Sequence, residues 1–299
     1  MENFLGLEYF IDANKRVYFL YLISSLLIAF IYLYFNAKEK RVNFSSKLWL
    51  HESSKIDYIY FFISNLIKVV LIIPMIIGAK EIALKVVFFL SDHFGYIRVD
   101  FSYESVIVLF SITLFVVSDF TRYWLHRLLH TVPILWEFHK VHHSAKVLNP
   151  LTFYRVHPIE NILFGLRYVF SIGFITGVFV YLFGAKVGLI EIFSVNIFVF
   201  VFSLLGSNLR HSHIKLAYPK ILEKVLISPK MHQIHHSTKH FDKNFGGYLS
   251  VWDYMFNTHI FSKEVQTMKF GLKKEQMVLY DSVLKLLFTP FIQVLKKRR

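Results

Sequence analysis

Eight histidines of this chain fall into three tight clusters, and their spacing is typical of metal ligands. The first cluster reads HRLLH, and the second and third, HKVHH and HQIHH, repeat one pattern. Residues at positions i, i+3 and i+4 of a helix share a face, with Cβ atoms about 5–6 Å apart. We therefore expect each cluster to lie on a helix and to aim its imidazoles at one point. The eight residues are His126, His130, His139, His142, His143, His232, His235 and His236.

The composition leaves histidine as the main side chain for holding a metal ion. The sequence has no cysteine, which excludes disulfides, thiolate zinc sites and iron–sulfur clusters. Imidazole suits iron, zinc, copper and nickel, and eight such ligands are too many for one ion but suit two. A pH sensor built from clustered histidines is the alternative, although it would not need the repeated spacing.

Residues outside the clusters extend the candidate site. His211, in SNLRHSH, is expected to be a ninth ligand, whereas His213 is off that helical face and is a weaker candidate. His157 precedes a proline, which disfavours helix, so it could be a ligand, a hydrogen-bond partner of a ligand or a substrate contact. Asp119 lies two helical turns before His126 and could accept a hydrogen bond from a ligating imidazole or form a helix-end salt bridge. Weaker candidates for accepting a hydrogen bond from a ligating imidazole are Glu160, Asp242 and Asp253.

The elements that must position the clusters are predicted to be membrane helices. The chain is 55% hydrophobic and has 33 phenylalanines, above the roughly 45–50% apolar residues of soluble domains. A bilayer-spanning helix needs about 20 apolar residues. Five stretches are candidates for such helices, although the fifth contains a glutamate and an asparagine. These stretches are Val17–Asn36, Tyr58–Ile77, Ser105–Tyr123, Ile162–Phe183 and Val187–Leu205.

Two shorter segments are read as interfacial. Ile82–Leu90 is too short to span a bilayer alone, so we expect a re-entrant piece, an interfacial piece or an extension of the second helix. Val283–Leu295 looks amphipathic and should lie on the surface. Three acidic residues precede the first apolar stretch, so a cleavable signal peptide is not expected. The predicted fold class is all-α: an integral membrane bundle of four to five transmembrane helices, with a cytoplasmic helical cap that carries the histidines.

The charge pattern suggests a membrane partner and an orientation. The net charge is +14, and basic runs such as Lys38–Arg41 and Lys296–Arg299 flank apolar stretches. Contact with anionic lipid headgroups explains these runs better than nucleic acid does. Because the loop at residues 37–56 is rich in lysine and arginine, we expect it on the cytoplasmic side. Counting spans from there places all three histidine clusters on that side in a multi-pass protein.

Over roughly Asp119–His259 the chain resembles the fatty acid hydroxylase/sterol desaturase superfamily of membrane-bound di-iron oxygenases. The resemblance is carried by DFTRYWLHRLLH, EFHKVHHS, FYRVHPIE, NLRHSH and SPKMHQIHHSTKHFDKNFGGYLSVWDYMFNTH. It implies that the eight clustered histidines and His211 bind the metals. Along the whole chain we expect three regions: N-terminal transmembrane helices with an interfacial segment (1–100), which show no motif resemblance, a fatty acid hydroxylase-like catalytic domain (101–262) and an amphipathic basic tail (263–299).

The resemblance further implies the use of O2 to hydroxylate or desaturate a C–H bond of a fatty acyl, sterol or related lipid. The cofactors would be two iron ions, with zinc possible in isolated protein. Since no nicotinamide, flavin or haem motif is present, we expect electrons from a separate protein of cytochrome or ferredoxin type. An apolar channel should open to lipid, and Phe153, Tyr154, Phe164 and Tyr168 could line it, although packing or lipid contact is their commoner role.

Two other functions stay open at this point. One is a non-catalytic relative that keeps a zinc-binding cage, since histidine sites bind zinc well. The other is a membrane metal transporter, which is disfavoured because transporters place polar ligands near the bilayer midplane, whereas these histidines lie at helix ends. The sequence does not distinguish hydroxylation, desaturation and ether cleavage, and it identifies neither the lipid nor the oligomeric state.

Overall fold

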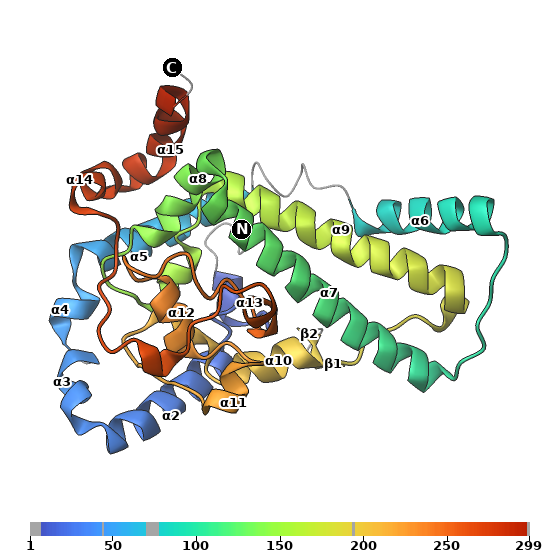
Figure 1. Ribbon diagram of the computed structural model, residues 1–299, viewed down its shortest axis with the longest axis horizontal. Coiled ribbons are helices and arrows are strands. Elements are labelled where there is room, and N and C mark those ends of the chain that lie inside the picture. Colours follow the sequence, from blue (N-terminus) through green and yellow to red (C-terminus); the bar gives the residue numbers. More distant parts are fainter. Residues whose placement is uncertain (1–6, 44, 70–77, 193–194, 298–299) are drawn as a thin grey trace.

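The structure is a computed structural model that describes residues 7–43, 45–69, 78–192 and 195–297. It consists of a head, which contains many short helices, and a long arm of three helices that extends from it (Figure 1). The arm is made of α6 (Ala79–Phe94), α7 (Tyr103–Thr131) and α9 (Pro158–Phe183). Helices α7 and α9 pack against each other, and α6 packs against α9.

Helices α7 and α9 are long because each begins with a residue that favours a helix start and neither has a proline beyond its first turn. The Ser102 side chain accepts a hydrogen bond from the Ser105 N–H at the start of α7, and Pro158 occupies the first turn of α9. With 29 residues, α7 is about 44 Å long and exceeds the roughly 30 Å of a bilayer core. Its last turns therefore reach into the head, where they carry His126 and His130.

Two glycines allow α6 to lie close to α9. A Cβ atom on Gly173 would lie 2.7 Å from Cβ of Ile82, and one on Gly177 would lie 2.6 Å from Cβ of Val86. Small residues four apart are a common way for membrane helices to approach closely. The segment Ile82–Leu90 is thus part of α6, a separate helix of the arm that packs against α9, and not an extension of the second predicted span.

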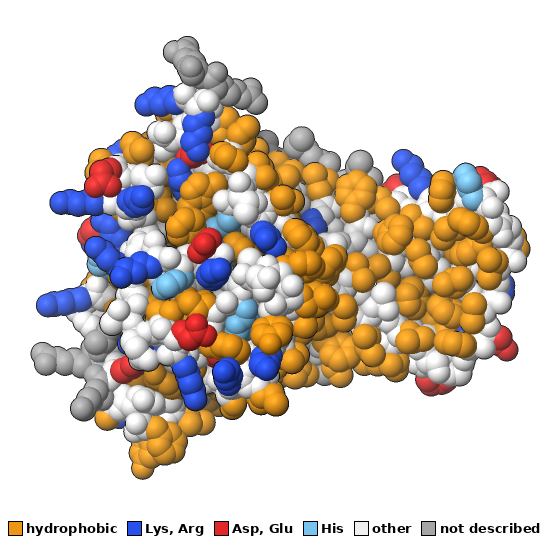
Figure 2. Space-filling model, in the orientation of Figure 1, with side chains coloured by type: hydrophobic (Ala, Val, Ile, Leu, Met, Phe, Trp, Pro, Cys, Tyr) orange, Lys and Arg blue, Asp and Glu red, His pale blue; other side chains and the backbone are white. Residues whose placement is uncertain are grey.

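The surface of the arm differs from that of the head. On the face shown in Figure 2, hydrophobic side chains cover most of the arm, lysine and arginine gather over the head, and charged groups return at the arm's far tip. Phe88, Phe89, Phe170 and Phe174 are among the exposed aromatic residues of the arm. An apolar band between two polar ends is the pattern of a segment that crosses a bilayer.

The predicted third and fourth spans are confirmed as long apolar helices. Among the described residues, α7 and α9 are long and apolar enough to cross a membrane, and a third candidate arises only if α14 (Lys274–Met277), η9 (Val278–Tyr280) and α15 (Val283–Lys297) are taken as one broken helix. Since α15 has an amphipathic sequence with a lysine-rich end, we regard it as a surface helix, as expected. The predicted number of four to five spans is not reached in the described part of the chain.

The first two predicted spans form helices of the head. The stretch Val17–Asn36 is α2 (Phe19–Phe35), an apolar helix of 17 residues. The stretch Tyr58–Ile77 overlaps α5 (Glu52–Ile67), and residues 70–77 lie outside the described residues. Helix α5 buries polar side chains, including Asp57 and Asn65, so its described part is a packed helix of the head.

The fifth predicted span, Val187–Leu205, is wrong as a continuous helix. Its first part is extended, with β1 (Glu191–Ile192) antiparallel to β2 (Val195–Asn196), and α10 (Ile197–Leu204) has only 8 residues. Ser111 of α7 holds this segment, because its Oγ accepts from the Ile190 N–H at 2.8 Å and its carbonyl accepts from Nδ2 of Asn196 at 3.0 Å. The Asn196 side chain then caps α10, so helix begins only there.

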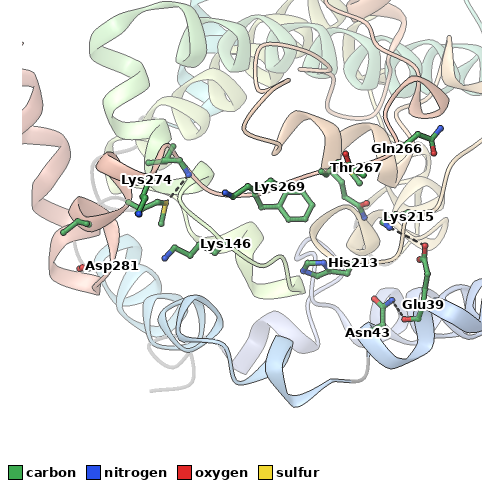
Figure 3. A pocket seen from close by; sticks show the side chains of 16 residues that line it. Glu39, Asn43, Lys146, His213, Lys215, Gln266, Thr267, Lys269, Lys274 and Asp281 are labelled. Carbon is green, nitrogen blue, oxygen red and sulfur yellow. Dashed lines mark hydrogen bonds and ion pairs between the residues drawn. The ribbon is translucent and has the colours of Figure 1, made fainter.

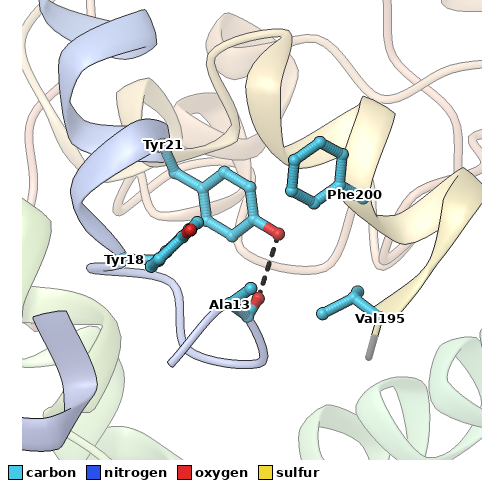
Figure 4. Close-up of a cluster of buried hydrophobic side chains, with 5 residues drawn as sticks. All are labelled: Ala13, Tyr18, Tyr21, Val195 and Phe200. Atoms are coloured by element: carbon cyan, nitrogen blue, oxygen red, sulfur yellow. Dashed lines mark hydrogen bonds between the residues drawn. The ribbon is translucent and has the colours of Figure 1, made fainter. Parts of the chain in front are cut away.

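The N-terminal segment is fixed to α10 by an aromatic cluster (Figure 4). The Tyr21 hydroxyl donates to the Ala13 carbonyl at 2.9 Å, and its ring packs edge-on against Phe200. Next to this cluster, the Arg16 guanidinium donates to the Ser207 carbonyl at 2.8 Å. The cluster therefore fixes the segment that carries Arg16.

The remaining short elements complete the head around the histidines. They are η1 (Leu7–Phe10), η2 (Ala37–Glu39), α3 (Lys40–Asn43), α4 (Ser46–Trp49), α8 (Pro133–His143), η5 (Pro150–Tyr154), η7 (Ser207–His211), α11 (Lys220–Glu223), α12 (Pro229–His235), α13 (Val251–Met255) and η8 (Ser262–Glu264). The short η6 (Gly184–Lys186) instead follows α9 at the far end of the arm. Helix α15 covers α8.

Candidate metal centre

Nine histidines lie together in the head, in two adjacent groups. Within each group, one ring nitrogen of every residue lies within 4.8 Å of the others. The five-histidine group consists of His126, His130, His139, His143 and His235. The four-histidine group consists of His142, His211, His232 and His236. These are the nine residues that the sequence analysis named as ligand candidates.

The two HxxHH motifs occupy the ends of short helices that start with proline. Pro133 opens α8 and Pro229 opens α12, and each helix ends within its motif. Residues four apart stay together, because they share a helix face: His139 and His143 belong to one group, while His142 belongs to the other. In the third cluster His232 and His236 share the four-histidine group, and His235 lies in the five-histidine group.

The expectation that each cluster aims at one point is therefore wrong for the second and third clusters. Neighbouring residues on a helix point about 100° apart, so the adjacent pair His142 and His143 faces two groups at once. The adjacent pair His235 and His236 does the same from the opposite side. The doubled histidine of each motif thus joins the two groups.

The tautomers of four rings are fixed by acceptors around the centre. Carbonyl oxygens face Nδ1 of His126, His142 and His235, at 2.7, 3.2 and 2.7 Å. The Glu160 carboxylate faces Nδ1 of His139 at 3.0 Å, and both side chains are buried. Each Nδ1 therefore carries the proton, and Nε2 keeps its lone pair for a ligand.

The Nε2 atoms of the four-histidine group lie close to one another. In the four-histidine group, Nε2 of His211 lies 3.4, 3.1 and 3.2 Å from Nε2 of His142, His236 and His232. A neutral imidazole has a single N–H, so these contacts cannot all be hydrogen bonds. In the other group, the buried Nε2 atoms of His139, His143 and His235 have no hydrogen-bond partner among the described residues.

This arrangement fits metal ions. Metal–imidazole bonds are about 2.0–2.1 Å, which places two nitrogens on one tetrahedral ion about 3.3 Å apart, and the observed separations agree. Burial lowers the pKa of His139 to about 3 and that of His142 to about 4, and it lowers those of His211 and His235 well below 6.5. The rings are therefore neutral at physiological pH, which is the form that binds a metal.

A loop after the third cluster aims two of the acceptor carbonyls. Asn244 adopts a left-handed conformation with φ of 56°, which asparagine tolerates better than most residues. Its Nδ2 donates to the carbonyls of Met231 and Ile260, both at 3.1 Å, and its Oδ1 accepts from the Ile260 N–H at 2.9 Å. The carbonyls on either side of it, of Lys243 and Phe245, are those that face His235 and His126.

Two buried acids hold the rest of this loop. Asp253 accepts from the N–H groups of Phe245 and Gly246 at 2.8 and 2.7 Å. Asp119 accepts from the N–H groups of Tyr248 and Leu249 at 2.8 and 2.9 Å and from the Trp252 indole at 3.0 Å. Asp119 therefore contacts no imidazole and forms no salt bridge among the described residues, contrary to both expectations. Asp242 is exposed and plays no part.

A buried ion pair, which was not predicted from the sequence, holds the residue whose carbonyl faces His142. The Arg155 Nε donates to Oδ1 of Asp57 at 2.5 Å, and both side chains are buried. The same carboxylate accepts from Asn149 and Thr152, and the Arg155 carbonyl is the acceptor opposite His142. No local pattern could predict this pair, because its partners are 98 residues apart.

His157 and His213 lie outside both groups. The His157 Nδ1 accepts from the Ile159 N–H at 3.2 Å, and its Nε2 donates to the Leu287 carbonyl at 3.0 Å. Both nitrogens are thus engaged, since His157 caps α9 and contacts α15. The His213 Nε2 accepts from the Leu148 N–H at 3.2 Å.

A cavity of about 360 Å³ adjoins the two groups. His126, His139, His142, His211 and His232 reach its wall. Of the aromatic residues proposed to line a channel, Phe153, Tyr154 and Phe164 line this cavity, whereas Tyr168 does not. Its wall also contains several arginines and lysines, so the expectation of an apolar channel was incomplete.

A second hollow of about 920 Å³ lies elsewhere on the head and contains none of the nine histidines. Lys146, Lys269 and Lys274 lie toward one end of it, and Glu39 and Lys215 form an ion pair toward the other (Figure 3). His213 and Gln233 also line it. Gln233, in the wall of this basic groove, follows His232 of the four-histidine group in sequence.

The chain is similar to known lipid enzymes over this region. Residues 111–258 match the family model described as fatty acid hydroxylase. Alkylglycerol monooxygenase of Xenopus tropicalis is 30% identical over 148 residues, which are 49% of this chain and 29% of the relative. The Danio rerio alkylglycerol monooxygenase is 32% identical over 160 residues, 52% of this chain and 31% of the relative.

A plant relative is more distant. A very-long-chain aldehyde decarbonylase of Oryza sativa subsp. indica is 26% identical over 147 residues, 47% of this chain and 22% of the relative. The chain thus spans less than a third of the length of these curated relatives. No solved structure matches it.

Proposed function

The chain belongs to the fatty acid hydroxylase superfamily, and we propose that it is a membrane-bound, O2-dependent lipid hydroxylase with two iron ions. The observation that carries the proposal is the convergence of nine largely buried imidazoles into two groups, with unpartnered Nε2 atoms in the five-histidine group and Nε2 atoms that face one another in the four-histidine group. One ion would be held by the five-histidine group and the other by the four-histidine group. When bound, the irons supply the redox chemistry that activates O2 against an unactivated C–H bond.

The protein's own groups prepare the site for that chemistry. The acceptors at Nδ1 hold four of the rings in one tautomer, and the hydrogen bond from His139 to Glu160 makes His139 a better electron donor to a metal. Burial keeps bulk water away from the centre. Because all of the candidate protein ligands are histidines, the donor set does not depend on a carboxylate that shifts its binding mode.

Hydroxylation is the reaction we favour over desaturation or ether cleavage as the first step. The relatives with the higher identities are named monooxygenases. In such a reaction one oxygen atom enters a C–H bond and the other leaves as water, with two electrons and two protons consumed. The alternatives, a zinc-binding relative without activity and a metal transporter, predict no oxygenated lipid.

Electrons would come from a separate protein of cytochrome or ferredoxin type, and we propose the basic groove of Figure 3 as its docking face. The three lysines at one end of the groove would attract an acidic donor, and Gln233 of its wall is next in sequence to His232 of the four-histidine group. Reversing charge with Lys146→Glu and Lys269→Glu should slow reduction of the loaded protein by an acidic donor. Unchanged reduction rates across a salt series would reject this docking face.

We propose that the arm crosses the bilayer and that the head, with both histidine groups, lies on the cytoplasmic side. The apolar arm and the lysine and arginine of the head support this orientation. The chain has no native cysteine, so single cysteines can report it. A thiol reagent that does not cross membranes should label Tyr96→Cys, at the arm's tip, from outside the cell and Lys239→Cys only after lysis. The reverse pattern would overturn the orientation.

The function is tested by lipid mass spectrometry of host membranes. Expression of the chain should produce a lipid heavier by one oxygen atom. His142→Ala and His235→Ala, which each disrupt one group, should abolish this product, while His240→Ala, outside both groups, should retain it. Product formation by either of the first two variants, or no oxygenated lipid with the iron-loaded protein, would contradict the proposal.

A further inference from the structure

Arginines from four separate parts of the chain meet at the cavity beside the histidine groups. Arg16 comes from the N-terminal segment, Arg122 from α7, Arg167 from α9 and Arg210 from η7. Arg210 is buried and the other three are partly buried. Two lysines of the same wall, Lys15 and Lys68, add to the positive charge, although Lys15 is 3.7 Å from Asp12.

These arginines have no carboxylate partner. None of the four forms an ion pair within the parts of the chain that the structure describes, where the arginine ion pair is that of Arg155 with Asp57. The nearest acids of the centre form no ion pair with them: Glu160 faces His139, and Asp119 accepts three N–H groups and attracts Arg122 and Arg167 only from a distance. Metal ions in the two groups would add further positive charge.

The arginines are held in place by neutral contacts. Arg210 donates to the Gly247 carbonyl, and its buried Nε has no partner among the described residues. Arg167 donates through one terminal nitrogen to the Ser118 carbonyl at 2.7 Å, and its Nε is likewise buried and unpartnered. Arg16 lies over the Phe153 ring at 4.6 Å. Backbone and aromatic contacts thus orient the side chains and leave N–H groups unused.

Arg122 is the least engaged of the four. It lies beside the rings of Phe164 and Tyr248, each at 5.8 Å, and no hydrogen bond or ion pair to it is found in the described residues. The pKa of Arg16 is lowered to about 10, mainly by burial, and the positive charge of Arg122 contributes to this shift. The two cations are therefore close enough to repel each other, and such a cluster is costly unless an anion neutralises it.

We propose that this cavity binds the anionic oxygen headgroup of an amphiphilic substrate, a phosphate or a carboxylate, through Arg16, Arg122, Arg167 and Arg210. Guanidinium groups match such oxyanions in geometry and charge. A volume of about 360 Å³ is at the small end of ligand pockets, which run from about 300 to 1,000 Å³, so it holds a headgroup and the first part of a chain. Rings of both histidine groups reach the same cavity, which places the carbons near the headgroup closest to the metals.

This inference rests on the proposed function, and it goes further because it selects charged over neutral lipids. A neutral glyceryl ether or a sterol would leave the arginines without a counter-charge. Free inorganic phosphate offers the same oxyanion as an alkyl phosphate but lacks the chain, so the two can be compared directly.

The test is equilibrium binding to iron-loaded protein in nanodiscs of uncharged lipid. The probes are an alkyl phosphate, the fatty acid and the 1-alkylglycerol of one chain length, and inorganic phosphate. The two anionic amphiphiles should bind at least about tenfold more tightly than the alkylglycerol, because charge-assisted hydrogen bonds contribute about 1.5–3 kcal/mol. Equal binding of the neutral lipid, or equally tight binding of inorganic phosphate, would overturn the proposal.

Variants of Arg122 test whether the arginine recognises the charge of the headgroup. Arg122→Gln should weaken binding of the alkyl phosphate by about 10- to 100-fold and leave the alkylglycerol unchanged, whereas Arg122→Lys should retain most of the affinity. Arg98→Gln, at the exposed arm tip, is the matched control and should behave as the native protein. If Arg122→Gln weakens all probes equally, the arginine does not recognise charge.

The outcomes separate this inference from the function itself. The headgroup series on the native protein decides the inference even if a variant fails to fold, and it requires no turnover. Anionic amphiphiles that bind but yield no oxygenated product would sink the proposed function alone. Products from neutral lipids only would sink the inference alone.

Discussion

Glu160 contacts one of the two histidine groups, so its removal should weaken one metal site and spare the other. Its Oε1 accepts the Nδ1–H of His139 at 3.0 Å, and both side chains are 2% exposed. Glu160→Ala would leave this buried N–H without an acceptor, at a cost of about 1–3 kcal/mol. Loss of such a partner lowers metal affinity by about 10- to 100-fold, or about 1.4–2.7 kcal/mol. The two magnitudes agree, so we expect this loss at the five-histidine group alone. In Glu160→Gln the amide oxygen can still accept, and the loss should be about tenfold or less.

The assay is metal content per chain after dialysis of iron-loaded protein against increasing chelator. Glu160→Ala should release one ion early and keep the second over a plateau, while the native protein keeps both. Glu137→Gln is the matched control, because Glu137 is equally buried on α8 but pairs with Lys140 and contacts no imidazole. Simultaneous release of both ions from Glu160→Ala, or a release curve like that of the control, would refute the reasoning.

Three further predictions concern the groups that support the centre. Asn244→Gly and Asn244→Ala lose the same hydrogen bonds, but glycine tolerates the left-handed backbone, whereas alanine adds about 1–2 kcal/mol of strain. Asn244→Gly should therefore lose less metal than Asn244→Ala. Equal metal content in the two variants would show that backbone strain is unimportant. Asp57→Asn should lower the unfolding free energy by about 3–5 kcal/mol by leaving Arg155 buried and unpaired, and an unchanged melting temperature would contradict this. Burial lowers the pKa of His157 to about 4, so the neutral ring stabilises the fold above pH 6.5 and this contribution falls by about 3 kcal/mol as the pH drops to 4. The stability advantage of the native protein over His157→Asn should therefore shrink over that range, and a constant difference would refute the assignment.

The extent to which the sequence predicted this centre can be judged from its histidines. The nine residues that meet in space were all named in advance. Eight were named because helical spacing shows which side chains share a face, and His211 because of its place before the third cluster and the family resemblance. The division into two groups was not foreseen. Spacing within one helix does not show that two neighbouring histidines, such as His142 and His143, belong to different groups. Each group is completed by histidines from other parts of the chain.

Long-range contacts explain the other differences. The helices α7 and α9 could be predicted from length and hydrophobicity alone, but the stretch at 187–205 was misread because Ser111 and Asn196 stop a helix that composition favours. The Asp57–Arg155 pair and the arginine cluster join segments that no local pattern connects. Tertiary contacts of this kind leave no periodic signal in one sequence.

The central claim, that nine histidines hold two metal ions, is tested most directly by counting metal per chain in iron-reconstituted protein. We predict about two ions in the native protein. We predict about one in His235→Ala, which opens the five-histidine group, and about one in His142→Ala, which opens the four-histidine group. One ion or fewer in the native protein, or an unchanged count in both variants, would contradict the account.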